Sequence, residues 1–365
     1  MSPKLKLEPL PEIDLRHLRR LTDDTGIFQH AVYATPDPNH GYCIDDNARA
    51  MIAGLLHAQL RGHDEQTIPL HTYLGFIAYA YNAQTQKFRN FMDYSRRWLE
   101  NEGSHDSQGR AIWSLGLTAA HGPTVPIRQL ARDLYQRALD KIDSIDGIEY
   151  DRSWAFALLG IDAFLDAHPD HAPSRESFER FGHQLYDLLQ QNRRDNWPWW
   201  EELVTYDNAK LPHGLLVAGS RLGHPDMTRA GFETLRWILD QQRSQDDKGR
   251  PYLSIIGNDG WLRRGHTRAR YDQQPLEAYA LVDACLYAAR LADTPDQRRD
   301  WESEARLCFD WFLGRNDEAR PLFDPDTGGS RDGLQPDGVN KNQGAESSLA
   351  YLLSVLEMHR YRAGL

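Results

Sequence analysis

Cysteine is scarce in this chain of 365 residues, which contains only Cys43, Cys285 and Cys308, far apart in the sequence. No two of them form a CxxC pair, so the sequence indicates neither a disulfide framework nor a zinc site. No stretch approaches 18 consecutive apolar residues, which excludes a transmembrane helix. The first residues contain no apolar signal core, so we expect a cytoplasmic protein that does not bind membranes.

Positive charge is also limited, with 42 Lys+Arg against 53 Asp+Glu and a formal net charge of −11. An acidic chain without a basic cluster is a poor partner for nucleic acid, because contacts to phosphates need grouped Lys and Arg. HExxH, EF-hand and paired Cys/His spacings are missing, so we expect no metal and no cofactor. With 40% hydrophobic and 26% charged residues, the composition is that of an ordinary globular protein.

Alternating strand patterns are not evident, whereas apolar residues recur at helical spacing along almost the whole chain. The pattern predicts an all-α protein with twelve helices. Most of the alternate helices carry many charges, which predicts that this layer faces solvent, and the helices between are rich in Ala, Gly and Leu and should be buried. The predicted helices span residues 12–22, 46–61, 68–82, 108–120, 126–142, 151–167, 174–192, 208–222, 226–243, 273–292, 296–313 and 343–361.

The starts of the buried helices resemble one another, which amounts to a weak internal repeat. Each combines Asp or Asn with amide or aromatic neighbours, at residues 42–49, 106–111, 150–154, 206–210, 271–275 and 340–346. Asp and Asn at helix starts commonly cap free N–H groups. Capping does not explain the tyrosines at 150, 206 and 271, or the glutamines that follow. If the six buried helices form a ring, their N-termini converge on one cavity.

Six hairpins with such inner-helix starts resemble the (α/α)6 barrel, or six-hairpin toroid, of many glycoside hydrolases, some polysaccharide lyases and the N-acylglucosamine 2-epimerase group. Residues 23–31, 41–49, 199–201 with 205–209, and 342–347 look like a bacterial family commonly labelled glycosyltransferase or glycosidase-related. The resemblance covers about residues 15–360. It implies an N-terminal extension at 1–14 and one barrel domain at 15–365. A nucleotide-sugar transferase would show βαβ units, which are missing, so the glycosyltransferase label is disfavoured.

The chemistry of glycosyl-bond hydrolysis selects the candidate catalytic residues, because it needs two carboxyl groups beside the anomeric carbon. Glu201 follows Trp197, Trp199 and Trp200, and an acid packed against rings is desolvated and becomes a plausible proton donor. Glu202 shares this setting. The predicted catalytic carboxylates are Asp46, Glu201, Asp207 and Glu346. Asp46 and Glu201 should face each other about 6.5–9.5 Å apart, which favours inversion.

The remaining polar and aromatic residues at the helix starts are candidate substrate-binding residues. Asn47 and Arg49 would position the acid pair, and Glu277 lies four residues past Gln273 on one helix face. The predicted binding set is His30, Asp45, Asn47, Arg49, Trp199, Trp200, Tyr206, Asp272, Gln273, Gln274, Glu277, Asn342 and Gln343.

The leading hypothesis is a glycoside hydrolase acting on a short oligosaccharide, and two alternatives stay open. A sugar 2-epimerase or isomerase on the same barrel would need two histidines facing each other across the cavity, with His30 or His40 opposite His213 or His266 as the options. A noncatalytic glycan-binding protein would have aromatic residues in its pocket but no opposed acids. Sequence does not determine the oligomeric state.

Overall fold

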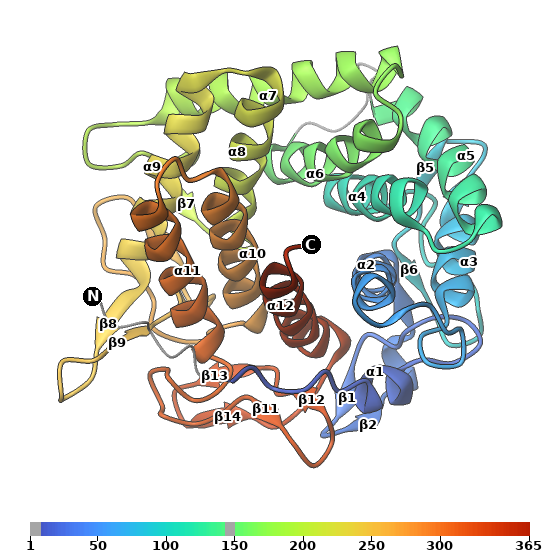
Figure 1. Cartoon of the computed structure of the whole chain (residues 1–365). Coiled ribbons are helices and arrows are strands. Elements are labelled where there is room, and N and C mark those ends of the chain that lie inside the picture. The colour runs from blue at the N-terminus through green and yellow to red at the C-terminus, as the bar shows by residue number, and fades with distance from the viewer. Residues whose placement is uncertain (1–8, 143–149) are drawn as a thin grey trace.

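The structure is a double ring of helices, as the repeat predicts. The computed structural model describes residues 9–142 and 150–365. In that part of the chain, inner helices surround one axis and outer helices pack against them, which makes an all-α (α/α)6 barrel (Figure 1). Of the expected N-terminal extension, residues 9–14 contain no helix or strand, and residues 1–8 lie outside the described part.

Each inner helix packs against the next around the ring, and the last, α12, contacts the first, α2, so the barrel is closed. The inner helices are α2 (Ile44–Arg61), α4 (His105–His121), α6 (Asp151–Ala167), α8 (Lys210–Leu222), α10 (Pro275–Leu291) and α12 (Ala345–Ala363). The outer helices are α3 (Leu70–Ala80), α5 (Val125–Ile142), α7 (Ala172–Asn192), α9 (Pro225–Gln242) and α11 (Pro295–Asp310), with α1 (Arg16–Leu21) against α12.

The first helix is shorter than the predicted 12–22. Asp14 accepts a hydrogen bond from the backbone N–H of Arg16 at 2.9 Å, so the chain turns there, and Thr22 is already extended. All strands of the described residues are two or three residues long and pair as antiparallel two-stranded ribbons between helices. The pairs are β1 (Ala31–Val32) with β2 (Thr35–Pro36), β3 (Tyr42–Cys43) with β6 (Phe91–Met92), β4 (Tyr81–Asn82) with β5 (Lys87–Phe88), β7 (Leu203–Val204) with β10 (Leu262–Arg263), β8 (Arg243–Gln245) with β9 (Pro251–Leu253), β11 (Phe323–Asp324) with β12 (Gly329–Ser330), and β13 (Gly333–Gln335) with β14 (Gly338–Asn340).

Small residues let the inner helices approach closely. A Cβ atom on Gly116 of α4 would lie 2.0 Å from the carbonyl oxygen of Gly160 of α6, so the two backbones touch there. This contact explains why the buried helices are rich in Gly and Ala. Although these helices are largely buried, none in the described part of the chain is both long and apolar enough to cross a membrane.

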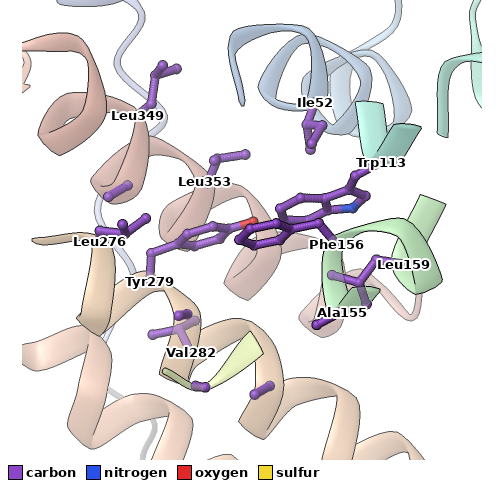
Figure 2. Close-up of a cluster of buried hydrophobic side chains, with 14 of the residues drawn as sticks. Ile52, Trp113, Ala155, Phe156, Leu159, Leu276, Tyr279, Val282, Leu349 and Leu353 are labelled. Carbon is purple, nitrogen blue, oxygen red and sulfur yellow. The ribbon is translucent and has the colours of Figure 1, made fainter. Parts of the chain in front are cut away.

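Side chains from the inner helices fill the middle of the barrel, so it is not a pore (Figure 2). Trp113 of α4 and Phe156 of α6 stack with their ring centroids 6.0 Å apart. The buried Lys210 ammonium lies 4.4 Å from the Trp113 ring and 4.5 Å from the Tyr279 ring. Trp113 and Tyr279 also line a small cavity of about 180 Å³ toward the C-terminal halves of the inner helices. The opposite end, where the helices begin, holds the larger cavity described below.

Candidate functional site

The starts of the inner helices gather at one end of the barrel, as predicted. Direct contacts between side chains connect them: Arg49 of α2 pairs with Glu346 of α12, Ser153 of α6 donates to Asp106 of α4, and Asn208 before α8 donates to Glu277 of α10. The acidic residues at these helix starts do not occupy the N-cap positions. The residues at the N-cap positions are Cys43, Ser104, Tyr150, Ala209, Gln274 and Gly344.

A cavity of about 420 Å³ opens at this end, between the starts of α2, α10 and α12 and the loops before them. Its lining is polar, with five carboxyl groups, one arginine, several amides and a single aromatic ring. The lining side chains include Asp45, Asp46, Arg49, Asp272, Asp332, Glu346, Gln29, His30, Gln274, Asn258, Gln335, Asn340 and Phe91. Seven predicted site residues therefore share this cavity: His30, Asp45, Asp46, Arg49, Asp272, Gln274 and Glu346.

Arg49 connects two of these acids from adjacent helices. Its Nη1 lies 2.9 Å from Asp46 Oδ1, and its Nη2 lies 3.0 Å from Glu346 Oε2. The guanidinium is buried, whereas the Glu346 side chain is 41% exposed and faces the cavity. A guanidinium can bind two carboxylates because its donors have a fixed planar arrangement. Glu346 is thus held in one position while part of its carboxylate stays accessible.

Asp46 is the buried member of this pair, with 4% of its surface exposed. The thiol of Cys43 donates a hydrogen bond to its Oδ2 at 3.1 Å, so both carboxylate oxygens have partners within the protein. Burial raises the pKa of Asp46 to about 6, and the charge of Arg49 opposes that rise. With both oxygens engaged, Asp46 is placed to hold Arg49 and Glu346 in position.

Asp45 and Asp272 face the cavity from two sides of α12. Each has one carboxylate oxygen that is buried and has no hydrogen-bond partner in the protein. A buried acceptor without a partner is costly unless a ligand supplies a donor. These two acids therefore suit a ligand rich in hydroxyl groups.

The sequence reasoning missed Asp332, which lies in the loop between β12 and β13. Asp332 does not lie at a helix start but reaches the cavity from the loop that precedes α12. The available signal was the glycine-rich stretch around Gly328, Gly329 and Gly333, which makes a tight polar loop possible. The amides of Gln29, Asn258, Gln335 and Asn340 also line the cavity and were not among the predicted site residues.

The predicted catalytic role of Glu201 is not supported by its position. Its carboxylate does not line the cavity but pairs with the buried Arg152 at 2.8 Å. The expected opposition of Asp46 and Glu201, and the inversion inferred from it, therefore lose their basis. Glu202 is exposed and pairs with Arg264.

The tryptophans before Glu201 belong to the hydrophobic core, which corrects their predicted role in binding substrate. Trp199 and Trp200 are 0% and 1% exposed. The Trp199 ring packs against Trp237 of α9 at 5.4 Å, and the Trp200 indole donates to the backbone oxygen of Leu185 at 2.8 Å. Rings this enclosed cannot stack on a sugar. Tyr206 also lies outside the cavity, with the Arg152 guanidinium 5.1 Å from its ring.

Asp207 and Glu277 form a buried polar layer beside the cavity and do not line it. Arg110 binds Asp207 at 2.7 Å, and Glu277 accepts hydrogen bonds from the backbone N–H groups of Asp207 and Asn208. Burial raises the pKa of Glu277 to about 7, with a further contribution from the charge of Asp207. Because Asp207 is fully buried, its predicted catalytic role is not supported by its position.

Four other predicted binding residues make structural hydrogen bonds away from the cavity lining. Their side-chain partners are the backbone of Cys43 and Ile27 for Asn47, Asp317 and Trp311 for Gln273, the backbone N–H of Tyr33 for Asn342, and Asp324 and Thr327 for Gln343. These amides fix the loops that surround the cavity, so their effect on a ligand is indirect.

The histidines are not arranged as a facing pair. His30 lines the cavity, and its ring centroid lies 4.5 Å from that of the neighbouring His40. Burial, and then the neighbouring His40, lower the pKa of His30. His213 lines the small cavity at the other end with Asp283, and His266 is exposed. Within the described residues, no group of three or more His, Cys, Asp or Glu is placed to hold a metal ion.

Comparison with solved structures places this architecture among (α/α)6 barrels. The chain is similar over 96% of its length to a sugar epimerase from a ruminal bacterium, covering 95% of that chain with a TM-score of 0.69 and 11% identity. It is similar over 95% to cellobiose 2-epimerase from Spirochaeta thermophila DSM 6192 (92% of that chain, TM-score 0.66, 14% identity). It is also similar over 95% to the GH76A α-1,6-mannanase from Salegentibacter sp. HEL1_6 (96% of that chain, TM-score 0.60, 13% identity). No family model matches the sequence, and the comparison with curated proteins finds no match.

Proposed function

We propose that this protein is a glycoside hydrolase that cleaves a short oligosaccharide in the cavity at the helix starts. The observation that carries the proposal is the Glu346 carboxylate, which Arg49 holds in a cavity lined by further carboxyl groups. Carboxylates and amides are suited to bind sugar hydroxyls, and hydrolysis needs an ionised carboxylate beside a protonated one. The volume of about 420 Å³ is that of a small-ligand site, which favours a short substrate or the end of a longer one.

In this proposal Glu346 is the base that activates the attacking water. The Arg49 guanidinium holds Glu346 Oε2 at 3.0 Å, and the accessible part of the carboxylate can reach a water in the cavity. Direct attack by that water would invert the anomeric carbon. Asp46 is a positioning residue that orients Arg49, and Asp45 and Asp272 bind sugar hydroxyls.

The fold neighbours support a carbohydrate substrate but include both hydrolases and epimerases. The Salegentibacter mannanase is described in an inactive form with two consecutive aspartates replaced, in complex with α-1,6-mannotriose. The cavity of this chain also contains an adjacent aspartate pair, Asp45-Asp46. The proposal favours hydrolysis over epimerisation because neither His213, which lines the small cavity at the other end of the barrel, nor the exposed His266 faces His30 across the site.

The experiment that tests this function is an incubation of the purified protein with gluco- and manno-oligosaccharides of different linkage. New reducing ends and epimers should both be measured. We expect new reducing ends without epimers. Epimer formation would support the isomerase alternative instead, and tight binding without conversion would support a noncatalytic glycan-binding protein.

The Glu201→Gln variant should keep hydrolytic activity within about threefold of the wild type, because Glu201 does not line the cavity. It should lose roughly 1 kcal/mol of stability, since the pair with Arg152 is partly exposed and Arg152 also contacts Asp151. Kinetics and urea unfolding of the same preparation measure the two effects. An activity loss of 100-fold would return Glu201 to the mechanism.

A further inference from the structure

Asp332 is fixed in the cavity wall by the backbone on both of its sides. Its own N–H donates to the carbonyl of Asn342 at 2.8 Å. Two residues on, Leu334 exchanges hydrogen bonds of 3.0 and 2.9 Å with Gln273, which precedes α10. The loop is therefore attached both to the segment leading into α12 and to the one leading into α10. A carboxyl group held in this way is preorganised, as a catalytic group needs to be.

The carboxyl group of Asp332 lies close to the start of α12. Its Oδ1 accepts a hydrogen bond from the N–H of Gly344 at 2.7 Å. Within the described residues, no Arg, Lys or His forms an ion pair with it. Burial raises its pKa, and the hydrogen bonds from the Gly344 N–H and the Ser347 side chain oppose that rise. Of the titratable groups around it, Glu346 raises the pKa further and His30 lowers it. The charged groups that line the rest of the cavity are Asp45, Asp46 and Arg49 from α2 and Asp272 from the segment before α10.

Two carboxyl groups of one cavity thus have opposite electrostatic surroundings. Arg49 binds Glu346 at 3.0 Å, whereas within the described residues no cation forms an ion pair with Asp332, and burial raises the pKa of Asp332. Two carboxyl groups of one site can take the separate roles of acid and base when their surroundings differ in this way. Asp46 is less suited to donate the proton, because it is 4% exposed and is itself paired with Arg49 at 2.9 Å.

We propose that Asp332 is the general acid of the hydrolysis, an assignment that rests on the proposed function. Its proton passes to the glycosidic oxygen as the bond from that oxygen to the anomeric carbon breaks. The attacking water gives its oxygen to the anomeric carbon and one proton to Glu346. One water is consumed for each bond cleaved, and exchange with solvent returns Asp332 to its protonated form and Glu346 to its ionised form.

The dependence of the hydrolysis rate on the leaving group tests whether Asp332 is the general acid. In Asp332→Asn, hydrolysis of the natural oligosaccharide should fall by ~1000-fold, in the range expected for loss of a general acid. Hydrolysis of a 2,4-dinitrophenyl glycoside of the same sugar should fall by less than about tenfold, because that leaving group departs without being protonated. The decline of kcat/KM at high pH should also disappear for the variant. Asp337→Asn is the matched control, since Asp337 is exposed at the adjacent β13–β14 turn.

The variant should fold, because asparagine keeps an oxygen that can accept the Gly344 N–H, and thermal unfolding followed by circular dichroism checks this. Equal losses on both substrates in a folded variant, or no loss on either, would overturn the assignment of Asp332. Glu346→Gln serves as the contrast, because loss of the base should slow both substrates alike. If the wild type cleaves no glycoside at all, the proposed function fails, and the assignment of Asp332 fails with it.

Discussion

Replacing Glu346 with glutamine should lower kcat/KM for oligosaccharide hydrolysis by ~1000-fold or more, the largest loss of any single substitution that preserves the shape of the site. The amide cannot accept the proton of the attacking water, but it can still occupy the same space beside Arg49. We expect the loss to lie mainly in kcat, because the base acts in the transition state. Steady-state kinetics on the best substrate of the oligosaccharide panel measure it.

The matched control is Glu202→Gln, which makes the same chemical change at an exposed glutamate paired with Arg264. It should leave both kinetic constants unchanged. If Glu346→Gln retained more than about a tenth of the wild-type activity, Glu346 would not be the base. The cavity aspartates Asp45 and Asp272 would then be the next candidates.

Replacing Arg49 with alanine should abolish measurable hydrolysis and also destabilise the fold by roughly 3–5 kcal/mol at neutral pH. The substitution leaves the buried Asp46 without its cation and removes the group that holds Glu346, and an unpaired buried charge carries a cost of this size. Arg49→Lys keeps the positive charge but loses the fixed pair of donors, so we expect an intermediate effect. Urea unfolding and kinetics on both variants provide the measurement.

The destabilisation of Arg49→Ala should depend on pH in a definite direction. Arg49 lowers the pKa of Asp46, so its removal raises that pKa further above the value in the unfolded chain. A folded-state pKa above the unfolded value means that the folded protein binds the proton more tightly, and stability then falls as pH rises through that interval. The difference in the free energy of unfolding between Arg49→Ala and the wild type should therefore be smaller at pH 5 than at pH 8. An equal difference at the two pH values would show that Asp46 is not the group left unpaired.

The fold was predictable because the sequence patterns that indicate it lie within single helices and their starts. Helical periodicity and the contrast between charged and small-residue helices define the hairpins, and the repeated starts indicate a common orientation. The shorter α1 was not predictable from periodicity, because its beginning depends on a turn in which Asp14 accepts from the backbone of Arg16. The two-residue strands are too short to show the alternating pattern of apolar and polar residues that identifies a strand in a sequence.

The site was predictable where its residues lie on helix starts that face the cavity, as Asp45, Asp46, Arg49 and Glu346 do. The prediction was wrong for Trp199 and Trp200 because polar neighbours in sequence were taken as a sign of exposure. In the structure the rings pack against outer helices, and the backbone oxygen of Leu185 accepts the Trp200 N–H. Asp332 was not predicted, because the glycine-rich stretch indicates only a tight polar loop, and the place of Asp332 in the cavity depends on tertiary contacts of that loop with Asn342 and Gln273.

The central claim is that this cavity hydrolyses a glycosidic bond and does not epimerise a sugar. The measurement that tests it most directly is NMR of the purified wild type acting on its oligosaccharide in D₂O. Hydrolysis predicts that new reducing-end signals appear while C2 keeps its hydrogen, and that the first product formed has the inverted anomeric configuration. Deuterium at C2, together with the epimeric sugar, would contradict the account.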